Sequence, residues 1–230
     1  MKLRILGLDN SRYSTGWTII DINTDDIEFL TKHPSEGYKE GMKIIDYGYI
    51  DTSSIKEEGK TLIYIENAFT DIIRKYKPDA ISAEQMFVGS NKQVGVVLSS
   101  IHAIMKLVAA KANIPITYYS IMTIKSSVLG GMKLKKDDGT RKTGDEMKIE
   151  VANKVIDIFG KERFKDKLMT DDVTDAISCV ITYKNYNGVG VGKQSANHKK
   201  KSSKKKTLNS SSKGKTTSKK STTKSSIKKK

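Results

Sequence analysis

The sequence contains very little cysteine and histidine. Cys179 is the only cysteine among the 230 residues, so no disulfide can form within the chain. The three histidines are far apart in the sequence, and together with one cysteine they cannot complete a structural zinc site. These absences exclude a disulfide-rich secreted scaffold and a zinc finger, and they favour an intracellular, cytoplasmic protein.

Long apolar runs are also missing. No uninterrupted apolar run approaches the roughly 20 residues that are needed to cross a bilayer. The N-terminus leads directly into a predicted strand, with no signal peptide. We therefore expect a protein that makes no contact with a membrane.

Negative charge is absent from the C-terminal stretch. Residues 193–230 hold fifteen of the 42 lysine and arginine residues and no acid, which leaves 27 basic against 26 acidic residues in the rest of the chain. A segment so poor in apolar side chains cannot offset the entropy lost on ordering. We predict a folded domain over residues 1–187 and a disordered lysine- and serine-rich tail over residues 188–230. The tail would bind phosphates without reading sequence, or else serve solubility or localisation.

The remaining sequence alternates between strand and helix patterns. Apolar periodicity predicts strands over residues 2–8, 16–22, 43–52, 80–83 and 116–120, and helices over residues 61–77, 91–113, 123–129, 145–159 and 172–183. Short links make the first three strands antiparallel neighbours, and helical crossovers make the last two parallel. We therefore predict an α/β fold with a five-stranded mixed sheet flanked by helices.

Two further segments complete this prediction. Residues 23–41 are polar and contain proline and glycine, which indicates a loop or a ragged hairpin extension. The predicted helix 91–113 is apolar on more than one side, so its second surface packs either on a further layer or on a second subunit.

Four carboxylates stand at the ends of predicted elements. Asp9 ends the first strand, Glu84 ends the fourth, and Asp172 and Asp175 open the last helix. Taken singly, Asp9 is equally typical of a turn, and the helical pair is equally typical of a helix N-terminus, where the dipole favours acids. If the first and fourth strands are neighbours, all four carboxylates gather and repel one another unless they surround divalent cations. Carboxylate ligands suit Mg²⁺ or Mn²⁺, and two such ions are a typical arrangement for phosphodiester hydrolysis.

Three segments carry a resemblance to a known family. In chain order, ILGLDNSRYSTGW, AISAEQMF and DVTDAIS resemble the motifs of the RuvC family of Holliday junction resolvases, within the ribonuclease H-like superfamily. The resemblance covers residues 3–183. It implies a ribonuclease H-like fold and a homodimer that associates through the helix 91–113. It also implies a crossover junction endodeoxyribonuclease of DNA recombination and repair, which makes paired symmetric cuts in four-way junctions.

The resemblance also assigns roles to individual residues. It implies that Asp9, Glu84, Asp172 and Asp175 bind two Mg²⁺ ions, for which Mn²⁺ can substitute. Three further residues match family positions: Phe87 the aromatic that meets junction bases, Lys125 a lysine that faces DNA, and Lys148 a lysine near the scissile phosphate. The plainer interpretation of Phe87 is a core or lid residue, and that of each lysine is a solvated surface residue.

The sequence departs from the family pattern in two places. Asn10 and Ser11 stand where the family usually has Pro-Gly, which alters the turn but keeps the acid. The glycine- and lysine-rich loop 130–144 is longer than is usual in the family, so contacts with substrate would differ. We predict that Lys133, Lys135 and Lys136 in this loop bind DNA. With its lysine-rich tail, the chain is expected to be a viral or phage-type member.

Other functions remain open at this stage. A related nuclease of the same superfamily could act on forks, flaps, three-way junctions or RNA with the same fold and acids. An actin-like ATPase would need a repeated domain and further glycine-rich phosphate loops, which a chain of this length does not offer. A junction-binding protein without catalysis would not need four intact acids.

Overall fold

The structure is a computed structural model of the chain, and it describes residues 2–11, 13–23, 41–86, 92–131, 134–161, 164 and 171–187. Several predictions from the sequence lie outside the described residues: most of the loop 23–41, Phe87, Lys133 and the tail 188–230.

Five strands form one mixed sheet in the order β3-β2-β1-β4-β5. They are β1 (Lys2–Asn10), β2 (Ser14–Asn23), β3 (Met42–Asp51), β4 (Ala80–Glu84) and β5 (Ile116–Tyr119). β1, β2 and β3 pair antiparallel, whereas β1 with β4 and β4 with β5 pair parallel. The predicted five-stranded α/β fold is therefore confirmed, and the first and fourth strands are neighbours, which is the condition under which the four carboxylates gather.

Side-chain alternation along β1 assigns its residues to two faces. Leu6 and Leu8 are buried on one face together with Ile81 of β4. Ile5 is buried on the other face, and Gly7 and Asp9 follow it at two-residue steps.

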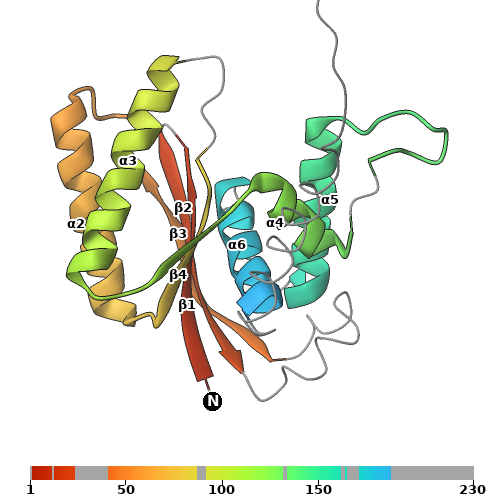
Figure 1. Cartoon of the computed structure of the whole chain (residues 1–230), viewed down its shortest axis with the longest axis horizontal. Coiled ribbons are helices and arrows are strands. Elements are labelled where there is room, and N and C mark those ends of the chain that lie inside the picture. The colour runs from red at the N-terminus through yellow and green to blue at the C-terminus, as the bar shows by residue number, and fades with distance from the viewer. Residues whose placement is uncertain are drawn as a thin grey trace, which may run out of the picture. The chain divides into compact units, whose positions relative to one another are not determined.

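Helices cover both faces of the sheet (Figure 1). The Leu6 face packs against α2 (Glu58–Tyr76) and α3 (Lys92–Lys111). The Ile5 face packs against α4 (Ile121–Leu129), α5 (Gly144–Phe159) and α6 (Asp171–Asn187). The apolar spacing of α2 explains its placement, because Ile65, Phe69, Ile72 and Tyr76 form one buried stripe.

The composition of α3 bears on the membrane prediction without deciding it. Its segment Val94–Lys111 has a mean hydropathy of 1.5 and is long and apolar enough, by length and composition only, to cross a membrane. The search for an uninterrupted apolar run missed this segment, because serine, histidine and lysine residues interrupt it. About a third of it is buried, and Val96 and Leu107 are large apolar side chains that remain exposed.

Two local details also differ from the prediction. The helix α4 begins at Ile121 rather than Thr123, since the side chain of Ser120 caps it by accepting a hydrogen bond from the amide of Thr123. The last helix begins at Asp171, one residue before the predicted start at Asp172.

Candidate active site

Two of the predicted carboxylates lie on neighbouring strands. β1 and β4 run parallel, with Leu8 paired to Ala83. The next residues on the two strands are Asp9 and Glu84, at the carboxyl ends of both. Alternation turns both side chains toward α6, because the residues two positions earlier on each strand also meet this helix.

Two glycines allow α6 to lie directly on the sheet. A Cβ atom at Gly7 would lie 2.2 Å from the carbonyl oxygen of Ala176, and one at Gly16 would lie 2.1 Å from that of Asp172. Only glycine permits so close an approach of two backbones. Gly16 pairs with Asp9 across β1 and β2, so this contact brings the first turn of α6, which carries Asp172, next to Asp9.

Two hydrogen bonds fix the helix to both catalytic strands. The hydroxyl of Ser82 donates to the carbonyl oxygen of Cys179 at 2.7 Å. The thiol of Cys179 donates to the carbonyl oxygen of Leu8 at 3.5 Å. Cys179 lies one helical turn after Asp175, and it is fully buried. β1, β4 and α6 are thus joined directly behind the carboxylates.

Burial and mutual repulsion shift the pKa values of the gathered acids upward. Burial raises the pKa of Asp9 well above its usual value, and the charges of Asp175, Glu84 and Asp172 raise it further. Burial and the charge of Asp175 raise the pKa of Glu84 to about 7. Burial raises the pKa of Asp175 to about 6. The fold therefore holds these carboxylates close enough for their charges to interact, although burial makes their ionised forms less stable.

Comparison with known proteins identifies the family. The profile described as Crossover junction endodeoxyribonuclease RuvC matches residues 35–183, which is more than half of the chain. The chain belongs to the RuvC family. This confirms the family and the enzyme class that the sequence motifs predict. The matched range begins after Asp9, so the place of that residue in the site depends on the pairing of β1 described above.

RuvC-family relatives are similar over much of the chain. The Crossover junction endodeoxyribonuclease RuvC of Ehrlichia chaffeensis is 29% identical over 135 residues, which cover 59% of this chain and 76% of that protein. The one of Caldicellulosiruptor saccharolyticus is 25% identical over 181 residues, which cover 79% and 92%.

Solved structures of the family share the fold. T. thermophilus RuvC in complex with a Holliday junction substrate superposes with a TM-score of 0.62 at 16% identity, and covers 81% of this chain and 95% of that one. The Fowlpox virus resolvase in complex with substrate Holliday junction DNA gives 0.50 at 12% identity, and covers 80% and 98%. At these identities the likeness concerns the fold, and it confirms the ribonuclease H-like architecture.

Two lysines accompany the acids of this RuvC-family site. The positive charges of Lys125 and Lys148 lower the pKa values of Glu84 and Asp175, though less than burial raises them. Nζ of Lys148 lies 3.5 Å from a carboxylate oxygen of Asp171. Partial burial lowers the pKa of Lys148, but neighbouring carboxylates, Asp171 first, outweigh it and raise the value. Both lysines are therefore cations beside the carboxylates, and their roles toward DNA stay predictions.

Two further predicted DNA-binding residues, Lys135 and Lys136, lie elsewhere in the described part of the chain. Lys135 is exposed between α4 and α5, and Lys136 forms an ion pair with Glu146 of α5. The sequence interpretation missed Ser82 and Cys179. The position of Ser82, two residues before Glu84 on the same strand face, was the one available signal.

The donor atoms suit a hard divalent cation. Within the described ranges, no three His, Cys, Asp or Glu side chains are already arranged as ligands of one metal ion. The acids that meet at the ends of β1, β4 and α6 nevertheless offer only oxygen atoms, as Mg²⁺ and Mn²⁺ prefer. Burial first, and repulsion between carboxylates second, raise the pKa values of Asp9, Glu84 and Asp175. A bound cation would offset both costs of the ionised form, so these residues fit either metal.

Proposed function

We propose that this RuvC-family chain is a metal-dependent, structure-selective endonuclease that resolves Holliday junctions by paired symmetric cuts. The observation that carries the proposal is the meeting of Asp9, Glu84 and Asp175 on one face of the sheet, with pKa values raised by burial and by one another. The membership of the chain in the RuvC family supports the same reaction.

The site residues have separate tasks in this proposal. Asp9, Glu84, Asp172 and Asp175 would hold Mg²⁺ or Mn²⁺, with two ions per site as the family resemblance implies. When bound, these ions would supply Lewis-acid stabilisation of the charge that develops on the phosphodiester. The ammonium group of Lys148 would neutralise part of that charge from the side of α5.

Paired cuts require two sites. We propose a homodimer in which α3 forms the interface, because this helix exposes Val96 and Leu107 and exposed large apolar side chains that gather on one element often mark such contacts. Phe87 and Lys125 would contact the junction DNA. The tail would add affinity through its lysines, in a manner that weakens steeply with salt. The viral or phage origin stays a prediction.

The Asp9→Asn variant tests the active site. We expect it to bind a four-way junction as the wild type does but to lose cleavage in Mg²⁺ almost completely, since the amide keeps the shape of the side chain and removes its charge. Asp71→Asn is the control, because Asp71 is an exposed acid of α2 whose ion pair in the described part of the chain is with Arg74, and it should cut normally. Cleavage by Asp9→Asn at the wild-type rate would show that the site is assigned wrongly.

A substrate comparison separates the alternatives. Four-way junctions, three-way junctions, forks, flaps, linear duplex and RNA of matched length would be incubated with the chain in Mg²⁺. The proposal expects two symmetric cuts in the four-way junction and slow or no cutting of the linear duplex. Equal cleavage of all branched substrates would favour the broader nuclease, and binding without any cleavage would favour a junction-binding protein.

A further inference from the structure

Residues 134–142, between α4 and α5, form a short β-hairpin. The amide of Lys142 donates to the carbonyl of Leu134 at 2.9 Å, and that of Lys136 donates to the carbonyl of Thr140 at 2.8 Å. Gly139 closes the three-residue tip with a φ of 82°, a conformation that favours glycine. The sequence predicts only a loop here, and the structure shows that part of this loop is paired as a hairpin.

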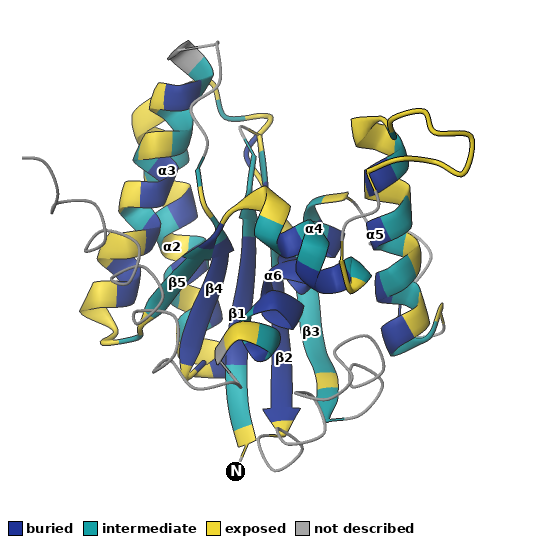
Figure 2. Ribbon diagram, turned by 45° about the vertical axis from the view of Figure 1, so that its right-hand side comes forward, coloured by how far each residue is buried: buried dark blue, intermediate teal, exposed yellow. Residues whose placement is uncertain are grey.

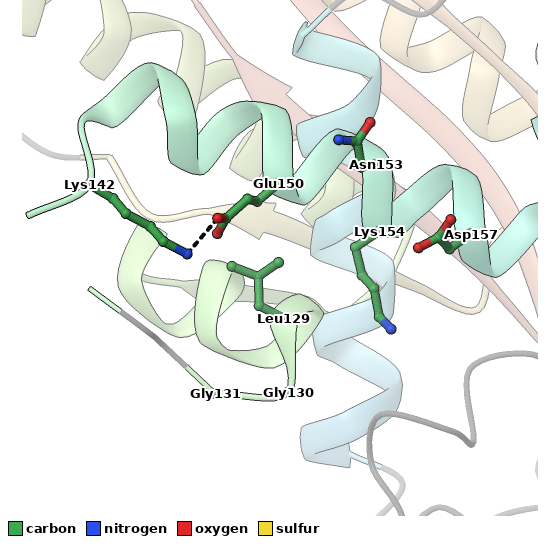
Figure 3. Close-up of a pocket in the computed structure, with 8 residues that line it drawn as sticks. All are labelled: Leu129, Gly130, Gly131, Lys142, Glu150, Asn153, Lys154 and Asp157. Atoms are coloured by element: carbon green, nitrogen blue, oxygen red, sulfur yellow. Dashed lines mark hydrogen bonds and ion pairs between the residues drawn. The ribbon is translucent and has the colours of Figure 1, made fainter. Parts of the chain in front are cut away.

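Two lysines anchor this hairpin to α5. Lys136 forms an ion pair with Glu146, and Lys142 forms one with Glu150 (Figure 3). The side chain of Lys142 is only 15% exposed, and it lines a cavity of about 500 Å³ between the end of α4 and α5. Glu146 also belongs to the capping box that begins α5 at Thr143. These two lysines therefore hold the hairpin at both ends, Lys142 at its base and Lys136 beside its tip, and their charges are already neutralised.

The other two cations of the hairpin face each other. Lys135 and Arg141 are cross-strand partners. The hydrogen bonds on either side of them, rather than between them, make this a non-hydrogen-bonded pair, in which side chains on one face come closest. Like charges directly opposite each other are destabilising. Neither side chain forms an ion pair within the part of the chain that the structure describes.

The acids of the tip do not relieve this repulsion. The carboxylate of Asp138 accepts hydrogen bonds from the amide and the hydroxyl of Thr140, at 2.8 and 2.6 Å. Asp137 forms no ion pair with either cation within the described residues. Figure 2 shows the hairpin exposed over most of its length, where it extends beyond the start of α5 at the end of the folded domain at which β1 and β4 also end.

We propose that Lys135 and Arg141 form a clamp for a backbone phosphate of a DNA arm, held in place by the two anchored lysines. The inference rests on the proposed function and adds a second point of contact with the substrate. An arginine fork and a lysine point charge together match the oxygens of one phosphodiester. A phosphate between them replaces the repulsion of the pair by two attractions. The clamp recognises the backbone and reads no bases.

The double variant Lys135→Gln/Arg141→Gln tests the clamp by binding alone. Affinity for a four-way junction and for a linear duplex would be measured without Mg²⁺ over a range of salt concentrations, so that cleavage plays no part. We expect affinity to fall by about tenfold and the salt slope to decrease by about one, on both DNAs. The control is Lys60→Gln/Arg74→Gln on α2, which removes the same charge from cations that pair with Glu57 and Asp71, and it should change binding far less.

A charge reversal separates the clamp from a general positive field. Lys135→Glu would place opposite charges across the hairpin, so it should protect residues 134–143 from proteolysis while it weakens DNA binding. Equal losses in the double variant and its control, or unchanged binding by the double variant, would overturn the clamp and leave the proposed function standing. If the wild type bound neither DNA, both proposals would be overturned. If it bound DNA through the clamp but did not cut junctions in Mg²⁺, only the proposed function would be overturned.

Discussion

At the scale of single residues, the carboxylates of the site should make stability depend on pH. The pKa of Glu84 is raised to about 7 and that of Asp175 to about 6 in the folded chain, above the values for unfolded peptides, near 4. The folded state thus binds more protons than the unfolded state between these limits. The contribution of these two groups to the free energy of unfolding is therefore largest below pH 4. It decreases as the pH rises through 6 and 7.

Thermal melting in the presence of EDTA measures this effect. We expect the melting temperature to decrease between pH 5 and pH 8, and Asp175→Asn to reduce the decrease. Added Mg²⁺ should restore stability at pH 8, since it binds the ionised carboxylates. A melting temperature that rises over this range in EDTA, in the wild type and not in the variant, would contradict the assignment.

Tyr118 offers a second test at this scale. Its hydroxyl is buried, and burial raises its pKa to about 12. Within the described residues it has no hydrogen-bond partner. Tyr118→Phe should leave the free energy of unfolding unchanged or raise it by up to about 1 kcal/mol, because the desolvated hydroxyl is removed.

The control for Tyr118 is Tyr76→Phe. The hydroxyl of Tyr76 donates a hydrogen bond to the carboxylate of Asp46, so its removal should cost about 1.5–3 kcal/mol. Urea unfolding of both variants gives the comparison. A loss in Tyr118→Phe as large as that in Tyr76→Phe would mean that the hydroxyl of Tyr118 does have a partner.

At the scale of elements, the seating of α6 depends on glycine. In Gly16→Ala the new Cβ would meet the backbone of Asp172 at 2.1 Å, so the first turn of the helix must shift. We expect loss of most cleavage activity and a decrease of about 1–3 kcal/mol in stability, as for an overpacked core. Gly59→Ala in α2 is the matched control. Nothing lies within 4 Å of its Cβ, so it should cut normally and be about 0.5–1 kcal/mol more stable.

Gly16→Ala should remain folded at 25 °C while it loses activity. Far-UV circular dichroism tests whether the variant is folded, and cleavage assays on the same preparations test whether it is active. Full activity in Gly16→Ala would mean that α6 can move away from β2 without disturbing Asp172.

The elements also mark what the sequence could predict. Two-residue alternation in β1 and the apolar stripe of α2 depend on neighbours along the chain, so the element order and the faces follow from the sequence, whereas the contact between β1 and β4 was only one possibility of the topology. The approach of α6 to Gly7, the bond from Ser82 to Cys179, and the ion pairs of Lys136 and Lys142 depend on distances between remote segments. For this reason the sequence offered the acids as candidates, but it did not indicate the groups that pack around them.

At the scale of the whole molecule, the proposed dimer is the feature to test. Val96 is 61% exposed on α3, and a glutamate placed there would be buried without a partner in a dimer that uses this helix. An unpaired buried charge costs about 3–5 kcal/mol. Val96→Glu should therefore shift the chain to a monomer. The monomer should cut one strand of a junction rather than make two paired cuts.

The control for the dimer is Ile63→Glu, at a similarly exposed position of α2 (59%). Sedimentation velocity and the ratio of nicked to fully resolved junction give the two measurements. If Val96→Glu sediments like the wild type and still makes paired cuts, α3 is not the interface.

The burial of Cys179 has a practical consequence. This single thiol lies wholly covered between α6 and β1, directly behind the carboxylates. A sulfhydryl reagent can reach it only when the helix lifts from the strands. The rate of alkylation of the native chain would therefore report how often α6 separates from β1 beside the proposed active site, without an engineered label.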